Sequence, residues 1–253
     1  MTKGRMRGVR VPLIVLLGFG LLIGVAGSVM AVPEATEVLA TTKQGGVINA
    51  TRFGPTGAPT KVLVIGQMHG TEPAGRAVVR NLAHRLVGET KIPADTVIWL
   101  ISTINPDGDA AGTRVNASGV DLNHNFPQDW RQQGGGTSSW SGPSAGSESE
   151  TAAVLAFLDR IQPTAVLSFH QPFAVVDITH EASRAAGRKL ATWVGLPARV
   201  VGCPGPCYGT LTGWVDGHLS AIALTVELPG KVSGAGVKRS ATAVLRLTRW
   251  LAR

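Results

Sequence analysis

Four short apolar runs constrain the fold of this chain more than any other feature. They are rich in β-branched residues and are bounded by turn residues, as buried strands are. Their sequences are KVLVIG (61–66), TVIWLIST (96–103), TAVLSFH (164–170) and IALTVEL (222–228). Because segments with helical periodicity separate them, the sequence predicts an α/β fold with a largely parallel, helix-covered sheet.

Helical periodicity is clearest in three segments between these runs and in one segment after them. The three segments are residues 73–87, 147–158 and 183–194. The stretch Lys238–Arg253 alternates basic and apolar residues and predicts an amphipathic helix that closes the fold. Residues 42–55 predict an added edge strand, and the Gly- and Ser-rich residues 132–147 predict a surface loop at the rim of a site.

The N-terminal segment differs in composition from the rest of the chain. Four basic residues and no acidic residue precede an uncharged stretch, residues 11–30, which ends in small residues. This pattern predicts a signal peptide over residues 1–31, followed by one catalytic domain over residues 32–253. The alternative is an uncleaved membrane anchor over residues 11–30, and membrane contact is expected only there. Both place the domain outside the cytosol, as a secreted or wall-facing protein.

The distribution of charge argues against nucleic acid as a partner. The formal net charge is +8, but residues 1–31 carry four basic groups and residues 231–253 carry six, with no acidic group in either segment. Residues 32–230 hold 14 basic and 16 acidic side chains, so this part of the chain is nearly neutral. Cys203 and Cys207 lie in CPGPC, which predicts a local disulfide in an oxidising compartment.

Polar side chains that can bind a metal follow two of the predicted strands. His69 comes just after the run 61–66, Glu72 precedes the helical segment that begins at Pro73, and His170 ends the run 164–170. Because the carboxyl ends of parallel strands meet at one edge of a sheet, these side chains are expected to lie together. Two histidines and one carboxylate fit a catalytic zinc site. The H-x-x-E pair alone would more commonly be a chance pair or a helix cap.

Glu227 lies inside the apolar run 222–228. Burying a lone carboxylate in a strand destabilises the fold by several kcal/mol unless the group is paired, is protonated or has a function at a site. Hydrolysis at a metal site needs a carboxylate that accepts the proton of the attacking water and passes it to the leaving amine. Glu227 is therefore the predicted general base, and the alternative is a strand-end carboxylate turned to solvent.

Seven motifs occur together in a characteristic order. They are HGTE (69–72), NPDG (105–108), Arg114, GVDLNHNFP (119–127), SFHQP (168–172), Tyr208 and TVELP (225–229). In order and spacing they resemble the zinc metallocarboxypeptidase (carboxypeptidase A-like) family, and the short chain and HQP resemble its murein tripeptide amidase group. The resemblance implies a single-domain α/β fold with a mixed, mostly parallel sheet of about eight strands covered by helices on both faces.

The resemblance also assigns roles to the predicted site. It makes His69, Glu72 and His170 the ligands of one Zn²⁺ ion and Glu227 the general base. Arg114 matches the arginine that polarises the scissile carbonyl and stabilises its developing oxyanion.

Four further residues match positions around the substrate or the metal. Asp121 matches a carboxylate that orients the first zinc histidine, Asn123 a residue that binds the terminal carboxylate, and Tyr208 a tyrosine that covers the substrate. The family's usual LNRNF is LNHNF here, with His124 in place of the arginine that clamps the terminal carboxylate. A histidine donates only one hydrogen bond to that carboxylate. Either another basic residue binds the carboxylate, or its recognition is looser and strengthens when His124 is protonated.

The resemblance implies a zinc peptidase or amidase that hydrolyses an amide bond near the C-terminal end of peptides. The predicted leader makes it an exported protein, and we expect a monomer. The export signal and the altered carboxylate clamp favour the γ-D-glutamyl-diaminopimelate bond of peptidoglycan stem peptides. The alternatives are an ordinary metallocarboxypeptidase, a small-molecule N-acyl amino acid deacylase and a non-catalytic wall-binding module.

Overall fold

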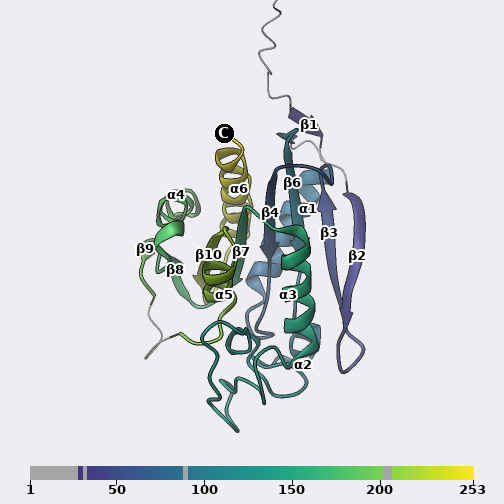
Figure 1. Cartoon of the computed structure of the whole chain (residues 1–253). Coiled ribbons are helices and arrows are strands. Elements are labelled where there is room, and N and C mark those ends of the chain that lie inside the picture. The colour runs from purple at the N-terminus through teal and green to yellow at the C-terminus, as the bar shows by residue number, and fades with distance from the viewer. Residues whose placement is uncertain (1–27, 31–32, 88–90, 202–206) are drawn as a thin grey trace, which may run out of the picture.

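The computed structural model describes residues 28–30, 33–87, 91–201 and 207–253. An eight-stranded sheet runs through its centre in the order β2-β3-β6-β4-β7-β10-β8-β9 (Figure 1). These strands are β2 (Pro33–Thr41), β3 (Val47–Phe53), β4 (Thr60–Ile65), β6 (Thr96–Ile101), β7 (Ala165–His170), β8 (Phe173–Asp177), β9 (Ala198–Arg199) and β10 (Ile222–Pro229). Strands β6, β4, β7 and β10 are parallel neighbours, so their carboxyl ends share one edge. The expected mixed, mostly parallel sheet is confirmed.

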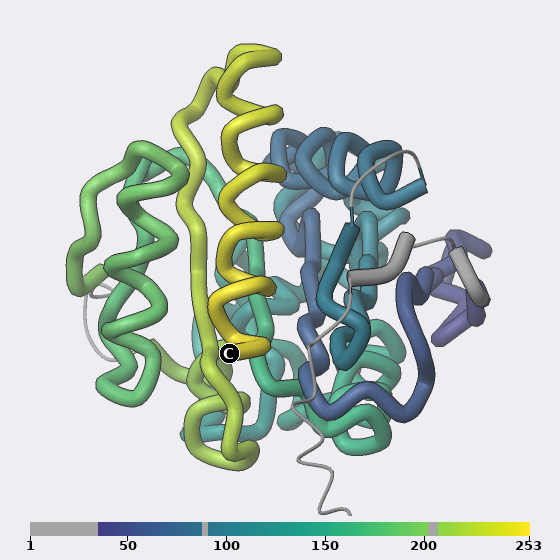
Figure 2. Tube along the Cα trace, turned by 90° about the horizontal axis from the view of Figure 1, so that it is seen from above, coloured from purple at the N-terminus to yellow at the C-terminus, as the bar shows by residue number. Residues whose placement is uncertain are grey.

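Helices cover both faces of this sheet. α1 (Ala74–Val87), α4 (Arg184–Val194) and α6 (Gly234–Leu251) pack on one face, with α6 between the other two (Figure 2). α3 (Ser149–Ile161) and α5 (Leu211–His218) pack on the other face. The short elements are α2 (Pro106–Ala111), the 3-10 helices η1 (Leu122–His124) and η2 (Glu181–Ser183), and a separate antiparallel pair of β1 (Ser28–Met30) with β5 (Lys91–Pro93).

The central strands are buried on both faces. In β4, Val62 and Val64 belong to the core under α1, α4 and α6, whereas Leu63 and Ile65 belong to the core under α3 and α5. This division follows from the two-residue period of a strand, which points successive side chains to opposite faces. Each fully buried aliphatic side chain contributes roughly 1.5–3 kcal/mol, so the continuous apolar runs hold both helical layers on the sheet.

The four predicted strands and the predicted closing helix α6 are confirmed, and residues 132–147 form a loop. The prediction of an edge strand within residues 42–55 is wrong in its position. β3 lies between β2 and β6, and β2 forms the edge. β2 contains Glu37 and exposed Val38, so its sequence lacks the apolar run by which the inner strands were recognised.

Most of the predicted leader lies outside the described residues, and its cleavage stays a prediction. β1 falls at its C-terminal end and pairs with β5. Within the described part of the chain, no helix is both long enough and apolar enough to span a bilayer. Cys203 also lies outside the described residues, so its disulfide with Cys207 stays a prediction.

Candidate active site

The carboxyl edge of the parallel strands brings the predicted metal ligands together. His69 and Glu72 lie in the connection from β4 to α1, where the Glu72 amide donates to the His69 carbonyl over 3.0 Å. This connection packs closely on α2, because a Cβ atom on Gly70 would lie 2.1 Å from the Gly108 carbonyl oxygen. His170 is the last residue of β7, and it is paired in register with Glu227 of β10. All these positions are ends of buried strands or turns that follow them.

The side chains of His69, Glu72 and His170 converge on one point. His69 Nδ1 lies 2.9 Å from Glu72 Oε1, and His170 Nδ1 lies 3.2 Å from Glu72 Oε2. The two Nδ1 atoms are 3.3 Å apart, and one ligand atom from each of the three residues lies within 4.8 Å of the others. All three side chains are buried. Imidazole nitrogen and carboxylate oxygen at this spacing fit a zinc ion.

The remaining ring nitrogens are held in a way that leaves both Nδ1 atoms available to a metal. His69 Nε2 lies 3.0 Å from Asp121 Oδ1, and His170 Nε2 lies 3.0 Å from Ser168 Oγ. A carboxylate at Nε2 favours the tautomer with the proton there, so Nδ1 presents its lone pair to a metal. This is the position that the resemblance predicts for Asp121.

Arg114 joins the metal cluster to Asp121. Its Nε donates to Asp121 Oδ2 over 2.9 Å, and its NH1 group donates to Glu72 Oε1 over 3.0 Å. The guanidinium is partly exposed, and its two hydrogen bonds fix its orientation. This geometry is compatible with the predicted stabilisation of an oxyanion.

Burial and hydrogen bonding act against each other on the acidic groups of the cluster. Burial raises the pKa of the Glu72 carboxyl, but the close contacts with the His170 and His69 rings lower it by more, so the net pKa lies below its ordinary value. Burial likewise raises the pKa of Asp121, and the bond to His69 with the charge of Arg114 outweighs this effect. Both groups are therefore ionised at neutral pH, as a cation site requires.

Glu227, the predicted base, lies beside the metal-ligand cluster, but its carboxylate has a different environment from those of Glu72 and Asp121. Glu227 is buried, and its Oε2 has no hydrogen-bond partner in the part of the chain that the structure describes. Burial is the main cause that raises the pKa of the Glu227 carboxyl, and the charge of Glu72 adds to it. The alternative, a strand-end carboxylate turned to solvent, is therefore excluded by the burial of Glu227. An unpaired oxygen with raised basicity is suited to proton transfer.

Gln171 connects three segments of the site, a role that the sequence analysis did not assign to it. Its backbone amide donates to Glu72 Oε2 over 3.2 Å, and its side-chain Oε1 accepts from the Ala74 amide over 2.9 Å. Its Nε2 donates to the Pro229 carbonyl over 2.9 Å and to the Gly230 carbonyl over 3.2 Å. One side chain thus joins the start of α1, the end of β7 and the end of β10. The signals in the sequence were its position directly after a metal-ligand candidate and its place in the HQP motif.

The predicted substrate-binding residues lie along a second side of the site. Asn123 Oδ1 accepts from the Leu211 amide over 3.2 Å, while its Nδ2 has no partner among the described residues. His124 Nδ1 lies 3.0 Å from the Tyr208 carbonyl and 3.1 Å from Gln133 Nε2, and its Nε2 lies 4.0 Å from Asp121 Oδ2. His124 therefore lies near Asp121, which in turn contacts the metal-ligand candidate His69.

Tyr208 lies close to a residue that the sequence gave no role. The Arg131 guanidinium carbon lies 4.1 Å from the centre of the Tyr208 ring. This distance suits a cation–π contact, and it places a fixed positive charge beside the tyrosine that is expected to cover the substrate.

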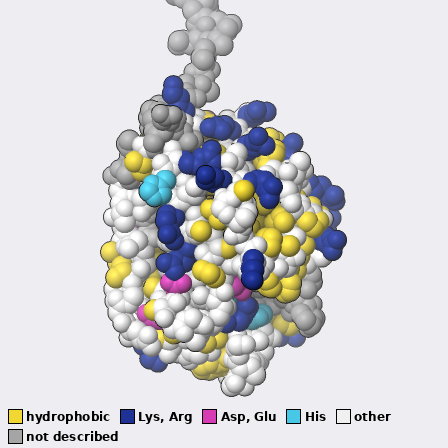
Figure 3. Space-filling view, turned by 180° about the vertical axis from the view of Figure 1, so that it is seen from behind, with side chains coloured by type: hydrophobic (Ala, Val, Ile, Leu, Met, Phe, Trp, Pro, Cys, Tyr) yellow, Lys and Arg dark blue, Asp and Glu magenta, His cyan; other side chains and the backbone are white. Residues whose placement is uncertain are grey.

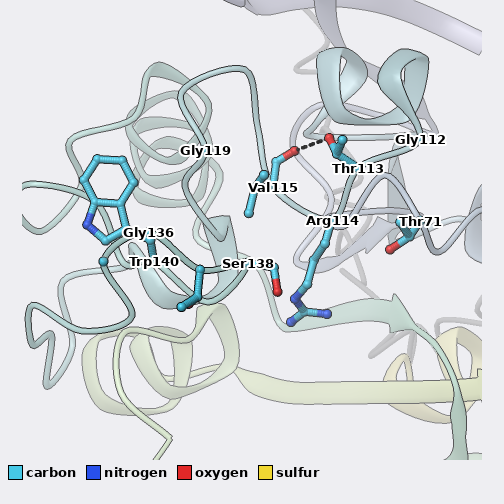
Figure 4. Close-up of a pocket in the computed structure, with 11 residues that line it drawn as sticks. Thr71, Gly112, Thr113, Arg114, Val115, Gly119, Gly136, Ser138 and Trp140 are labelled. Carbon is cyan, nitrogen blue, oxygen red and sulfur yellow. Dashed lines mark hydrogen bonds between the residues drawn. The ribbon is translucent and has the colours of Figure 1, made fainter.

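A cavity of about 770 Å³ opens beside Arg114 (Figure 4). Thr71, Val115 and Trp140 are among the residues that line it, together with Gly135 and Ser138 of the Gly- and Ser-rich loop. The Arg114 side chain points toward the space between these segments (Figure 4). The prediction that residues 132–147 form a rim of the site agrees with this position.

Fold and site together have the organisation of a metal-dependent hydrolase. A model of the zinc carboxypeptidase family matches residues 30–193. The chain belongs to this family of zinc-dependent enzymes, and it is a zinc metallopeptidase. The resemblance found in the sequence is therefore confirmed.

Within this family, the sequence of the chain is similar to those of murein peptide amidases. The chain is 31% identical to murein peptide amidase A of Escherichia coli K12 over 209 residues, which cover 78% of this chain and 82% of that protein. It is 32% identical to murein peptide amidase A of Vibrio campbellii over 146 residues, or 53% of this chain and 54% of that protein.

Solved structures agree with the fold. The murein-tripeptide amidase from Escherichia coli O157 superposes with a TM-score of 0.67 at 27% identity, covering 87% of this chain and 94% of that one. Carboxypeptidase A from Helicoverpa armigera superposes with a TM-score of 0.72 at 16% identity, covering 86% of this chain and 68% of that one. The second likeness shows the fold alone.

Proposed function

We propose that this protein is a zinc-dependent amidase that hydrolyses the γ-D-glutamyl-diaminopimelate bond of peptidoglycan stem peptides outside the cytoplasm. The observation that carries the proposal is the convergence of His69, Glu72 and His170 beside the unpaired carboxylate oxygen of Glu227. Similarity to murein peptide amidases supports the substrate class. The predicted leader, residues 1–31, supports the location.

The site residues divide the work of amide hydrolysis. Zinc held by His69, Glu72 and His170 would supply a Lewis acid for the substrate carbonyl and the attacking water. Glu227 accepts the proton of that water at Oε2 and delivers it to the leaving nitrogen of diaminopimelate. Arg114, fixed by Asp121 and Glu72, donates hydrogen bonds to the carbonyl oxygen as negative charge develops there.

The other side of the site holds the free carboxylate end of the substrate. Asn123 Nδ2 and the His124 ring offer hydrogen-bond donors near Asp121, and Tyr208 with Arg131 forms a wall above them. A diaminopimelate residue carries more than one carboxylate, so weak donors at several positions can replace one bidentate arginine. This arrangement accounts for a histidine where the family usually has arginine.

The decisive experiment is mass spectrometry of L-Ala-γ-D-Glu-meso-diaminopimelate incubated with the zinc-loaded protein. Release of diaminopimelate by the parent, and none by Glu227→Gln with zinc still bound, is the expected result. If the zinc-loaded parent releases none, the γ-D-glutamyl specificity is wrong. Release of C-terminal residues from ordinary peptides under the same conditions would then assign the chain as a metallocarboxypeptidase.

His124 is tested by the pH dependence of KM for the same tripeptide between about pH 5.5 and 8. If His124 binds a substrate carboxylate, KM of the parent is lower at the acidic end, whereas KM of His124→Arg is lower throughout and flat. Flat profiles in both proteins would remove His124 from carboxylate recognition and leave that role to Asn123 or Arg131.

A further inference from the structure

The helices on one face of the sheet carry charge of a single sign. α1, α4 and α6 contain ten Lys and Arg residues and no Asp or Glu. α2, α3 and α5 contain one basic and five acidic residues. Because α6 lies between α1 and α4, the basic side chains of three distant segments spread over one face, where Asp and Glu side chains are sparse (Figure 3). We call the exposed Lys and Arg side chains of these helices the basic face.

Most of this charge is not neutralised within the protein. Arg80 of α1, Arg188 of α4 and Arg246 of α6 are exposed, and none of them makes a salt bridge with another described residue. Arg76 does pair with Asp109, at the border of the face. Unpaired like charges repel each other and create a positive potential that attracts extended anions.

A groove at the border of the basic face adds neutral hydrogen-bond donors to these cations. It has a volume of about 400 Å³ and lies between α1 and strands β3 and β6. Arg76 and Arg80 line it together with Asn49, Thr51 and Ser102. Guanidinium groups beside hydroxyl and amide donors are the side chains that typically contact phosphate oxygens.

The large apolar side chains on the face, such as Trp193 of α4 and Trp250 of α6, are only partly exposed, although hydrophobic atoms are visible among the basic side chains in Figure 3. In the described parts of the chain, the large hydrophobic side chains with high exposure are Val38, Val47, Val87, Phe173 and Val200. Of these, only Val87 belongs to α1, α4 or α6, and it is the last residue of α1. Helices that lie on membranes insert several large apolar residues among their basic ones. A water-soluble partner therefore fits this face better than a bilayer.

We propose that the basic face binds a linear, phosphate-bearing polymer. Successive phosphate groups lie across α1, α4 and α6, and one of them enters the groove beside Arg80, which makes no salt bridge with another described residue. The metal cluster lies at the carboxyl edge of the sheet and is not part of this surface. The protein can therefore stay bound to the polymer while its catalytic edge acts on peptide.

Binding of the full chain to long-chain inorganic polyphosphate tests this proposal. The test variant Arg80→Gln/Arg188→Gln/Arg246→Gln removes one exposed charge from each helix. The matched control Lys43→Gln/Arg160→Gln/Arg199→Gln removes the same net charge from exposed positions elsewhere. At about 50 mM salt, the test variant is expected to bind on the order of tenfold or more weakly, with a shallower salt dependence, and the control within about twofold of the parent.

Three results would overturn the proposal. The first is no binding of the parent to polyphosphate at low salt, and the second is an equal loss of binding in both triple variants. The third is binding to poly-glutamate or to vesicles with anionic phospholipid that is as tight as binding to polyphosphate and equally sensitive to the test variant. The leader is the same in parent and variants, so it does not affect these comparisons, and the readout does not depend on hydrolysis.

Discussion

The catalytic edge and the basic face use charge in opposite ways. At the edge, Glu72, Asp121 and Arg114 are linked by direct hydrogen bonds, so charges of both signs are held in one geometry. On the basic face, exposed charges of one sign point to solvent from three helices. Buried paired groups act through position, whereas exposed groups act through the summed field. Single substitutions should therefore have large effects at the edge and small effects on the face.

The strongest challenge to this contrast is removal of a metal ligand. The His69→Ala protein should no longer bind one equivalent of zinc. Its kcat should fall below about a thousandth of the parent's value, because several kcal/mol of transition-state stabilisation are lost. Metal analysis and kcat for the tripeptide measure both effects. His84→Ala, at an exposed position on α1, is the matched control and should retain both. A His69→Ala protein with full zinc content and activity within tenfold of the parent would refute the ligand assignment.

Gln171→Met tests whether the edge depends on the side chain that joins its three segments. The substitution keeps a similar volume but removes the bonds to Ala74, Pro229 and Gly230. We expect zinc affinity or kcat/KM to fall roughly 10–100-fold, as for other residues that orient metal ligands. Competition with a chelator measures the affinity. If only the Tm of the metal-free protein falls and zinc affinity is unchanged, Gln171 is structural alone.

Glu227→Gln tests whether the buried carboxylate at the catalytic edge lowers the stability of the metal-free protein. The pKa of Glu227 is raised in the folded protein, so below the ordinary value of 4.5 the group is protonated in both states and costs nothing. As pH rises above that value, the unfolded state loses its proton first and the folded state is destabilised. Metal-free Glu227→Gln should therefore be more stable than the parent at pH 7, on the order of 1 kcal/mol, with the difference shrinking toward pH 4.

Urea unfolding of parent and variant in the presence of a chelator measures this difference at several pH values. Glu37→Gln, at a partly exposed carboxylate on β2, provides the control for removing a negative charge. A stability gain that is the same at pH 4 and pH 7 would mean that protonation of Glu227 is not its cause.

The smallest effect is expected on the basic face. Arg80→Gln/Arg188→Gln/Arg246→Gln should leave kcat/KM for the short tripeptide within about twofold and change stability by no more than about 0.5 kcal/mol per site, as exposed substitutions generally do. Steady-state kinetics at two salt concentrations give the answer. A tenfold fall in kcat/KM that salt abolishes would show that the face steers substrate, and the separation of the two regions would fail.

Much of the site could be predicted because its residues are tied to local patterns. His69, His170 and Glu227 each stand in or just after an apolar run, and parallel strands bring such positions to one edge. The order of the motifs then identified Asp121 and Arg114. Gln171 could not be assigned in this way, because its partners at Ala74, Pro229 and Gly230 are far away in sequence.

The sequence by itself determined the apolar strands, the helices between them and the candidate metal ligands, because periodicity, short spacings and the order of motifs can be read along the chain. Only the tertiary structure decided that β3 lies inside the sheet, that Gln171 joins three segments and that α1, α4 and α6 form one basic face. Residues 32–230 are nearly neutral as a count, but six of their basic side chains lie on α1 and α4, which pack beside the basic helix α6 on one face of the sheet. Contacts between distant segments depend on how the sheet orders its strands, and no local pattern encodes that order.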